Sequence, residues 1–144
     1  MLVATTTHAP HADPGRSQRR RLCWALTLTR VLSAVVFVSF GLGKFVDHAA
    51  ETSSFRSYGL PAPAAFTLVI GVLETAGGAL LVAGRATRIA GVLLIGDMLG
   101  AIVVSGILHG ETVSLTLAPA LLVAMCLLVA LGPGRVALDS RRTG

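Results

Sequence analysis

Four long apolar runs, separated by short polar stretches, dominate the hydrophobic pattern of this chain. They cover residues 22–45, 64–83, 89–108 and 113–131. Each holds about 20 residues or more, the length that a helix needs to cross a bilayer core of roughly 30 Å. The pattern therefore predicts four transmembrane helices. Because the connections are short, we expect an all-α, integral membrane four-helix bundle of up-down topology.

Polar and small residues inside these runs recur at helical spacing, which predicts the faces that meet within the bundle. The predicted inward face of the first run holds Arg30, Ser33, Phe37, Gly41 and Lys44. The second run carries one carboxylate, Glu74, and the pair Gly77 and Gly78, which would let a neighbouring backbone approach closely. In the third run, Gly96 and Gly100 form a small-residue motif of the kind that packs helices together.

The first connection, residues 47–63, is predicted to be a loop. Tyr58, Gly59 and the two prolines that follow them break a helix at this point. Phe55, Tyr58 and Leu60 are apolar enough either to lie at the membrane surface or to fold back over the bundle. The remaining ends of the chain are polar. We expect a disordered basic cytoplasmic tail over 1–21, a membrane domain over 22–132 and a cytoplasmic tail over 133–144.

Composition supports a membrane protein over a soluble one. Of the 144 residues, 53% are hydrophobic and 13% are charged, which is more apolar surface than a soluble domain of this size can bury. The net charge of +5 comes from basic residues at the ends of the apolar runs, a placement that fits anionic lipid head groups rather than nucleic acid. Cys23 and Cys126 form no CxxC pair, so we expect no disulfide framework and no metal site.

The distribution of lysine and arginine predicts the orientation in the membrane. Nine of the twelve lie before the first run, in the link 84–88 or after the last run, whereas the other two connections hold only Lys44 and Arg56. Positively charged loops stay on the cytoplasmic side. We therefore expect a multi-pass protein of a bacterial-type plasma membrane with both termini in the cytoplasm.

Apart from Lys44 at the end of the first run, three charges lie within the runs, and counting helical rise from the run ends places them at similar depth. By this count Arg30, Glu74 and Asp97 lie roughly 12–16 Å from the cytoplasmic edge. A guanidinium can pair with two carboxylates, and an unpaired charge there costs about 3 kcal/mol. We expect a cluster in which one acid holds a proton. It is either a proton-linked or quinone-binding site, closed on its outer side by Lys44 and Tyr58, or a polar clasp that fixes helix register.

The chain resembles the DoxX family of small four-helix membrane proteins over residues 25–131. The resemblance rests on Arg30, Gly41-Leu42-Gly43-Lys44-Phe45, Phe55 with Gly59-Leu60-Pro61, Glu74-x-x-Gly77-Gly78 and Arg85-x-x-Arg88. An uncharged residue is more usual in the family at the position of Asp97. The resemblance implies a membrane subunit linked to redox chemistry. Some relatives belong to thiosulfate:quinone oxidoreductase, and others associate with enzymes of oxidative-stress defence.

Three interpretations of function follow, and the sequence leaves open whether the chain is itself an enzyme. The first is an accessory membrane subunit of an oxidoreductase or oxidative-stress system, with quinone as the ligand. The second is a non-enzymatic scaffold that recruits a soluble partner, such as a redox enzyme, to the bilayer. The third is a small transporter acting as a homo-oligomer, although four helices are few for a transporter and no inverted repeat is visible.

The predicted orientation can be tested by cysteine accessibility. In a cysteine-free background, Ser57→Cys and Thr112→Cys should react with a membrane-impermeant thiol reagent in intact cells, because both lie in connections poor in arginine. Ser140→Cys should react only after lysis. Labelling of position 140 in intact cells would reverse the topology.

Overall fold

The computed structural model describes residues 14–132 and 134, and the regular structure in this part of the chain is helical throughout. The elements are α1 (Pro14–Val46), α2 (His48–Ser57), α3 (Pro63–Ala83), α4 (Thr87–Gly100), its π-helical continuation η1 (Ala101–Leu108) and α5 (Thr112–Leu131). Four segments are long and apolar enough to cross a membrane: α1, α3, α4 with η1, and α5. The prediction of an all-α membrane bundle with four spans is confirmed.

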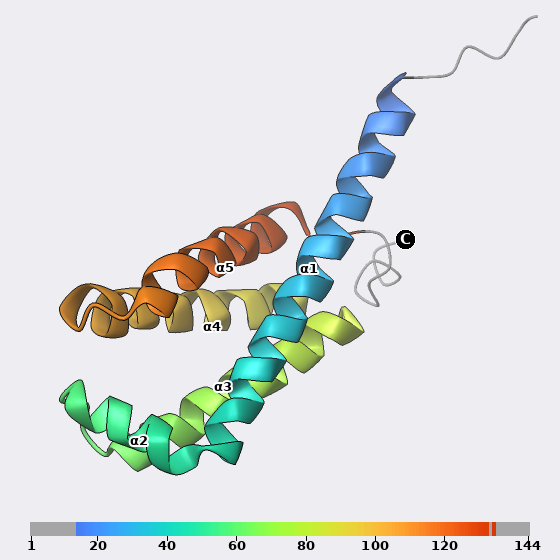
Figure 1. Cartoon of the computed structure of the whole chain (residues 1–144). Helices are drawn as coiled ribbons and strands as arrows, with labels where there is room; N and C mark the ends of the chain where they lie inside the picture. The colour runs from blue at the N-terminus through green and yellow to red at the C-terminus, as the bar shows by residue number, and fades with distance from the viewer. Residues whose placement is uncertain (1–13, 133, 135–144) are drawn as a thin grey trace, which may run out of the picture.

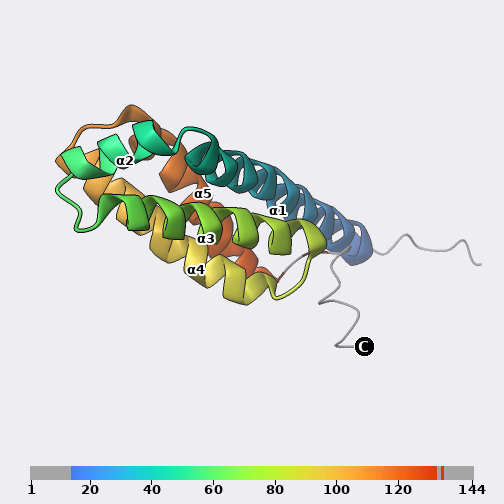
Figure 2. The same cartoon turned by 90° about the horizontal axis from the view of Figure 1, so that it is seen from below.

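Two helix pairs build the bundle. α1 packs mainly on α3, and α5 packs on α4 and η1, while contacts between α3 and α4 join the two pairs. Figure 1 shows α1 extending past the other helices at its N-terminal end. Figure 2 shows the short helix α2 at the opposite end, close to the turn between η1 and α5. One end of the bundle is therefore covered by α2.

The faces predicted from helical spacing point into the bundle. Arg30, Ser33, Phe37 and Lys44 on α1 are all at most 8% exposed. The outer surface carries large apolar side chains that are about half exposed, and these include Leu32, Val35, Val69, Val72, Val92, Leu93, Val103 and Val123. Such a surface suits a lipid bilayer, because a helix satisfies its own backbone hydrogen bonds and hydrocarbon accepts apolar side chains.

Glycines bring the backbones of α1 and α3 into direct contact. A Cβ atom on Gly78 would lie 2.7 Å from Cγ2 of Val38 and 3.0 Å from the carbonyl oxygen of Ala34. A Cβ atom on Gly41 would lie 2.9 Å from the carbonyl oxygen of Gly71. These positions accept no side chain without movement of a backbone, so the predicted close approach at Gly78 is confirmed.

The glycine motif of α4 behaves differently from the prediction. Space is open around both Gly96 and Gly100, since a Cβ atom on either would meet no other atom within 4 Å. Neither glycine therefore packs a helix in this structure. The prediction was wrong because glycine spacing identifies a smooth helix face without saying whether another helix lies against it.

Two further predictions need correction. α1 begins at Pro14, so residues 14–21 are helical and not a disordered tail, because arginine is a good helix former and extends the helix beyond the apolar run. The predicted loop contains α2, and the breakers act only from Tyr58 onward. Helix α2 buries Thr52, whose hydroxyl lies 3.4 Å from that of Thr67 on α3. The rest of the predicted N-terminal tail, residues 1–13, and the predicted C-terminal tail apart from Gly134 lie outside the described residues.

The contact between α1 and α3 predicts opposite effects for two glycines of α1. Gly41→Ala should destabilise the fold by about 1–3 kcal/mol, because its methyl group would meet the backbone of α3. Gly43→Ala should be neutral or stabilising by up to about 1 kcal/mol, because this glycine has open space around it and alanine favours helix.

Thermal unfolding of the purified protein in detergent measures both changes. The midpoint should fall for Gly41→Ala and hold or rise for Gly43→Ala. Equal midpoints for the two variants would mean that α1 and α3 do not touch as described.

Candidate functional site

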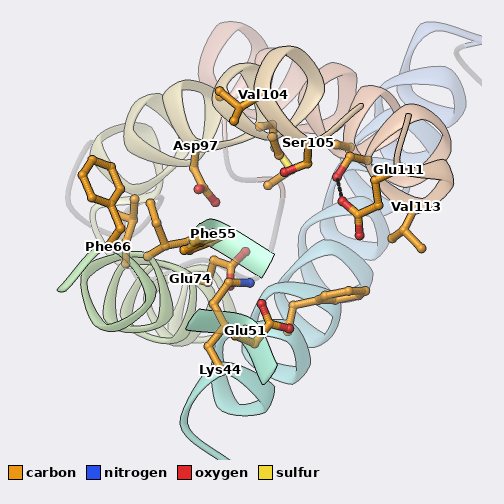
Figure 3. Close-up of a pocket in the computed structure, with 18 of the residues that line it drawn as sticks. Lys44, Glu51, Phe55, Phe66, Glu74, Asp97, Val104, Ser105, Glu111 and Val113 are labelled. Carbon is orange, nitrogen blue, oxygen red and sulfur yellow. Dashed lines mark hydrogen bonds and ion pairs between the residues drawn. The ribbon is translucent and has the colours of Figure 1, made fainter. Parts of the chain in front are cut away.

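A cavity of about 490 Å³ lies inside the bundle at the end covered by α2. Residues from all six helical elements line it, as the close-up in Figure 3 shows for part of the set. Its walls are largely apolar and aromatic, with Phe37, Phe40, Phe55, Tyr58, Phe66, Leu73, Met98 and Leu121 among them. Phe55, Tyr58 and Leu60 line this cavity, so the connection folds back over the bundle.

An ion pair between α1 and α3 forms the polar side of the cavity. The ammonium Nζ of Lys44 donates a hydrogen bond of 2.8 Å to Oε2 of Glu74. Both side chains are nearly enclosed, at 10% and 6% exposed. A buried charge is tolerated only when it is paired and hydrogen-bonded. Here the ammonium of Lys44 and the carboxylate of Glu74 neutralise each other and share a hydrogen bond.

The predicted pairing of Arg30 with the two carboxylates is wrong. Gly78 packs against Ala34, so Arg30, one turn earlier on α1, lies level with Val82. This position is roughly 12 Å along the helix axis from Glu74. Arg30 is buried, at 2% exposed, but near the turn that joins α3 to α4. The depth count failed because α1 extends past the turn between α3 and α4, so Leu22 lies outside the bundle and the count from it overestimated the depth of Arg30.

Asp97 on α4 is the predicted acid that does reach Glu74. It lines the same cavity and interacts electrostatically with both Glu74 and Lys44. Figure 3 shows the carboxylates of Asp97 and Glu74 directed toward one space from two helices. The oxygen Oδ2 of Asp97 is buried and accepts no hydrogen bond from the described residues. Asp97 therefore has one buried oxygen that receives no hydrogen bond from the described residues, on a side chain that lines the cavity.

Tyr58 holds the connection after α2 against the far end of η1. Its ring stacks on His109 with the centroids 4.5 Å apart, and Phe55 lies beside it at 6.2 Å. Burial raises the pKa of the Tyr58 phenol, the nearby Glu111 carboxylate raises it further, and a hydrogen bond with Ser105 acts in the opposite direction. The phenol therefore keeps its proton at neutral pH and remains a hydrogen-bond donor.

The π-helical geometry of η1 shapes the wall that faces Tyr58. A π-helix makes a wider turn than an α-helix and often occurs at functional sites. Val104 and Ser105 line the cavity from this turn. The turn is closed by two contacts, one of 2.7 Å between the His109 ring and the Val104 carbonyl and one of 3.0 Å from the Glu111 N–H to the Ser105 carbonyl.

Two acids that line the cavity, Glu51 and Glu111, were not among the predicted site residues. Both lie in connections between spans, where a charged residue is ordinarily solvated. The signal that would have found them is topological: an up-down bundle brings the first and third connections to the same end. Glu111 accepts a hydrogen bond from Ser114, whereas Glu51 comes from α2, the helix that covers the cavity.

The described acids, histidines and cysteines do not gather into a group of three that could hold a metal ion. Cys23 and Cys126 are free thiols. The cavity therefore offers an aromatic pocket, one ammonium group and several carboxylates, a set suited to an organic molecule with a ring and polar substituents.

Comparison with known proteins gives a consistent assignment. The DoxX family model matches residues 25–110. The "Uncharacterized membrane protein Rv3486" of Mycobacterium tuberculosis is 32% identical over 130 residues, which cover 78% of this chain and 77% of that protein. The "Putative oxidoreductase CatD" of Bacillus subtilis is 41% identical over 76 residues, 53% of this chain. That match spans about half of the Bacillus protein, at 55%. No solved structure matches.

The ion pair predicts strong coupling between Lys44 and Glu74. Lys44→Met should destabilise the protein by about 3–5 kcal/mol because it leaves Glu74 buried without its cation. Adding Glu74→Gln should recover part of that loss, because no uncompensated charge then remains.

A double-mutant cycle based on thermal unfolding in detergent checks the coupling. The matched cycle combines Arg30→Met with Glu74→Gln, and its two losses should add, since the residues lie on different turns of the bundle. Additive losses in the Lys44 cycle would show that the pair contributes nothing.

Proposed function

We propose that this chain, which belongs to the DoxX family of membrane proteins, binds a quinone as the membrane subunit of an oxidoreductase system. The observation that carries the proposal is the cavity, which joins aromatic walls to an ion pair and a carboxylate within a membrane bundle. The name of the Bacillus relative, an oxidoreductase, supports a role in redox chemistry.

The dimensions of the cavity suit a quinone ring. A volume of about 490 Å³ falls within the range of roughly 300–1,000 Å³ that small-molecule sites occupy. Aromatic rings such as Phe37, Phe55 and Phe66 offer flat faces against which a quinone ring can stack. A ligand of this kind is held by apolar contact over most of its surface.

A lipophilic ligand can enter from the bilayer. Phe40 on α1 and Val113 on α5 both line the cavity, and these residues are 44% and 46% exposed. The cavity wall thus reaches the outside of the bundle between these helices. An isoprenoid tail would extend through this side into the hydrocarbon, while the ring stays inside.

The polar groups supply the chemistry that a quinone needs. Lys44 and Tyr58 can donate hydrogen bonds to the quinone oxygens, and Glu74 and Asp97 can exchange the protons that accompany its two-electron reduction. In this proposal the electrons come from, or go to, a separate redox enzyme, which makes the chain an accessory subunit. With both termini in the cytoplasm, the cavity lies toward the outer side of the membrane.

Filling the cavity should abolish binding without disturbing the fold. Gly100 lines the cavity and has open space around it, so Gly100→Leu should occupy the ligand volume without a clash. Gly43 also has open space but lies outside the lining, which makes Gly43→Leu the matched control. We expect quinone affinity at least tenfold lower for Gly100→Leu and unchanged for Gly43→Leu.

Equilibrium titration of the purified protein with menadione measures the affinity, and mass spectrometry of the gently extracted protein reports any quinone that copurifies. Wild-type protein that neither copurifies with quinone nor binds menadione saturably would exclude the proposed function. Equal quinone affinity of the two leucine variants would show that the quinone binds outside this cavity.

A further inference from the structure

We propose that the cavity selects the reduced, quinol form of its ligand over the quinone, an inference that rests on the proposed quinone-binding function. The inference rests on which hydrogen-bond donors and acceptors line the cavity. A quinone presents two oxygens that only accept hydrogen bonds, whereas a quinol presents two hydroxyl groups that donate them. The wall can therefore tell the two forms apart by whether it needs donors or acceptors.

Acceptors predominate on this wall. Four carboxylates line the cavity, and they are Glu51 from α2, Glu74 from α3, Asp97 from α4 and Glu111 from the turn before α5. The wall has one cation among its described residues, Lys44, so its formal charge is −3 when every group is ionised. An ionised carboxylate only accepts hydrogen bonds. The carboxylates, which are the strongest hydrogen-bonding groups of the wall, thus favour a ligand with O–H donors.

Part of the donor capacity of the wall is already used within the protein. Lys44 donates to Glu74 at 2.8 Å, and Ser54 donates to the Ala50 carbonyl at 3.2 Å. Ser114 donates to Glu111. The remaining N–H groups of Lys44 and the phenol of Tyr58 can donate to an oxygen of either redox form, and only the quinol can also donate an O–H group to the carboxylates.

Among the four carboxylates of the wall, Asp97 has the buried oxygen that no described residue satisfies. Its Oδ2 is buried, receives no hydrogen bond from the described residues and belongs to a carboxylate that Figure 3 shows directed into the cavity. A quinol hydroxyl placed there forms a charge-assisted hydrogen bond. A quinone oxygen placed there meets a second acceptor, and a site built to receive an O–H group rejects an analogue that lacks it. We assign Asp97 as the residue that sets this specificity.

Affinity for the two redox forms of one molecule tests the assignment. Menadione and its quinol, handled without oxygen, are titrated separately into the purified full-length protein. The quinol should bind at least tenfold more tightly. Asp97→Asn keeps the shape of the side chain and adds an N–H donor, so it should bring the two affinities within about threefold. Asp47→Asn, a neighbouring acid outside the cavity lining, is the matched control and should preserve the wild-type ratio.

The outcomes separate this inference from the proposed function. Equal affinity of wild-type protein for both forms overturns the quinol preference and leaves quinone binding in place, whereas saturable binding of neither form removes both. A wild-type ratio in Asp97→Asn removes Asp97 as the selecting residue. Thermal unfolding confirms that each variant is folded. Should Asp97→Asn fail to fold, Glu51→Gln on the covering helix α2 replaces it, and an unchanged ratio there overturns acceptor-based selection.

Discussion

The Lys44–Glu74 ion pair is the contact on which the rest of the structure depends. An isolated charge at the centre of a membrane helix costs about 3 kcal/mol, so each of these side chains needs the other. The 2.8 Å contact ties α1 to α3 at a single register. At that register Gly41 lies against the backbone of α3, and Gly78 lies against that of α1. Electrostatics and close packing thus specify the same alignment of α1 and α3. Because both favour one register, they select it over the other registers that two apolar helices could adopt.

Glycine has two opposite roles in the bundle, and together they produce the cavity. On α1 and α3, glycines remove side chains where two backbones touch, which draws this pair of helices together. On α4, Gly96 and Gly100 remove side chains where no neighbour lies within reach, which leaves room. The cavity lies between the tight pair and the glycine face of α4, and it is covered by α2. The π-helical turn of η1 then brings Val104 and Ser105 to the wall.

Most of the fold could be predicted from the sequence, and the partners within the site could not. Helix number, the spans and the buried face of α1 follow from apolar length and helical spacing, which are properties of one segment at a time. The partner of Glu74 depends on the register between two helices. Counting from Leu22 placed Arg30 opposite Glu74, but contacts of Ala34 and Gly78 place Lys44 there. The helix α2 was missed for a related reason: its residues have little apolar periodicity, and it is stabilised by packing over the end of the bundle, where Thr52 meets Thr67.

Under the function that we propose, a register clasp and a ligand site are compatible, because the acids can divide between the two tasks. A clasp requires as many anions as cations, and Lys44 with Glu74 satisfies that requirement alone. Asp97 exceeds it: the residue lines the cavity beside a pair that is already neutral, and its buried oxygen gains no hydrogen bond from the described residues. A surplus carboxylate at this depth is destabilising, and nothing in the α1–α3 contact requires it. Under the proposed function, its position on the cavity wall serves interaction with the ligand, and an O–H donor is the kind of group that compensates an ionised carboxylate.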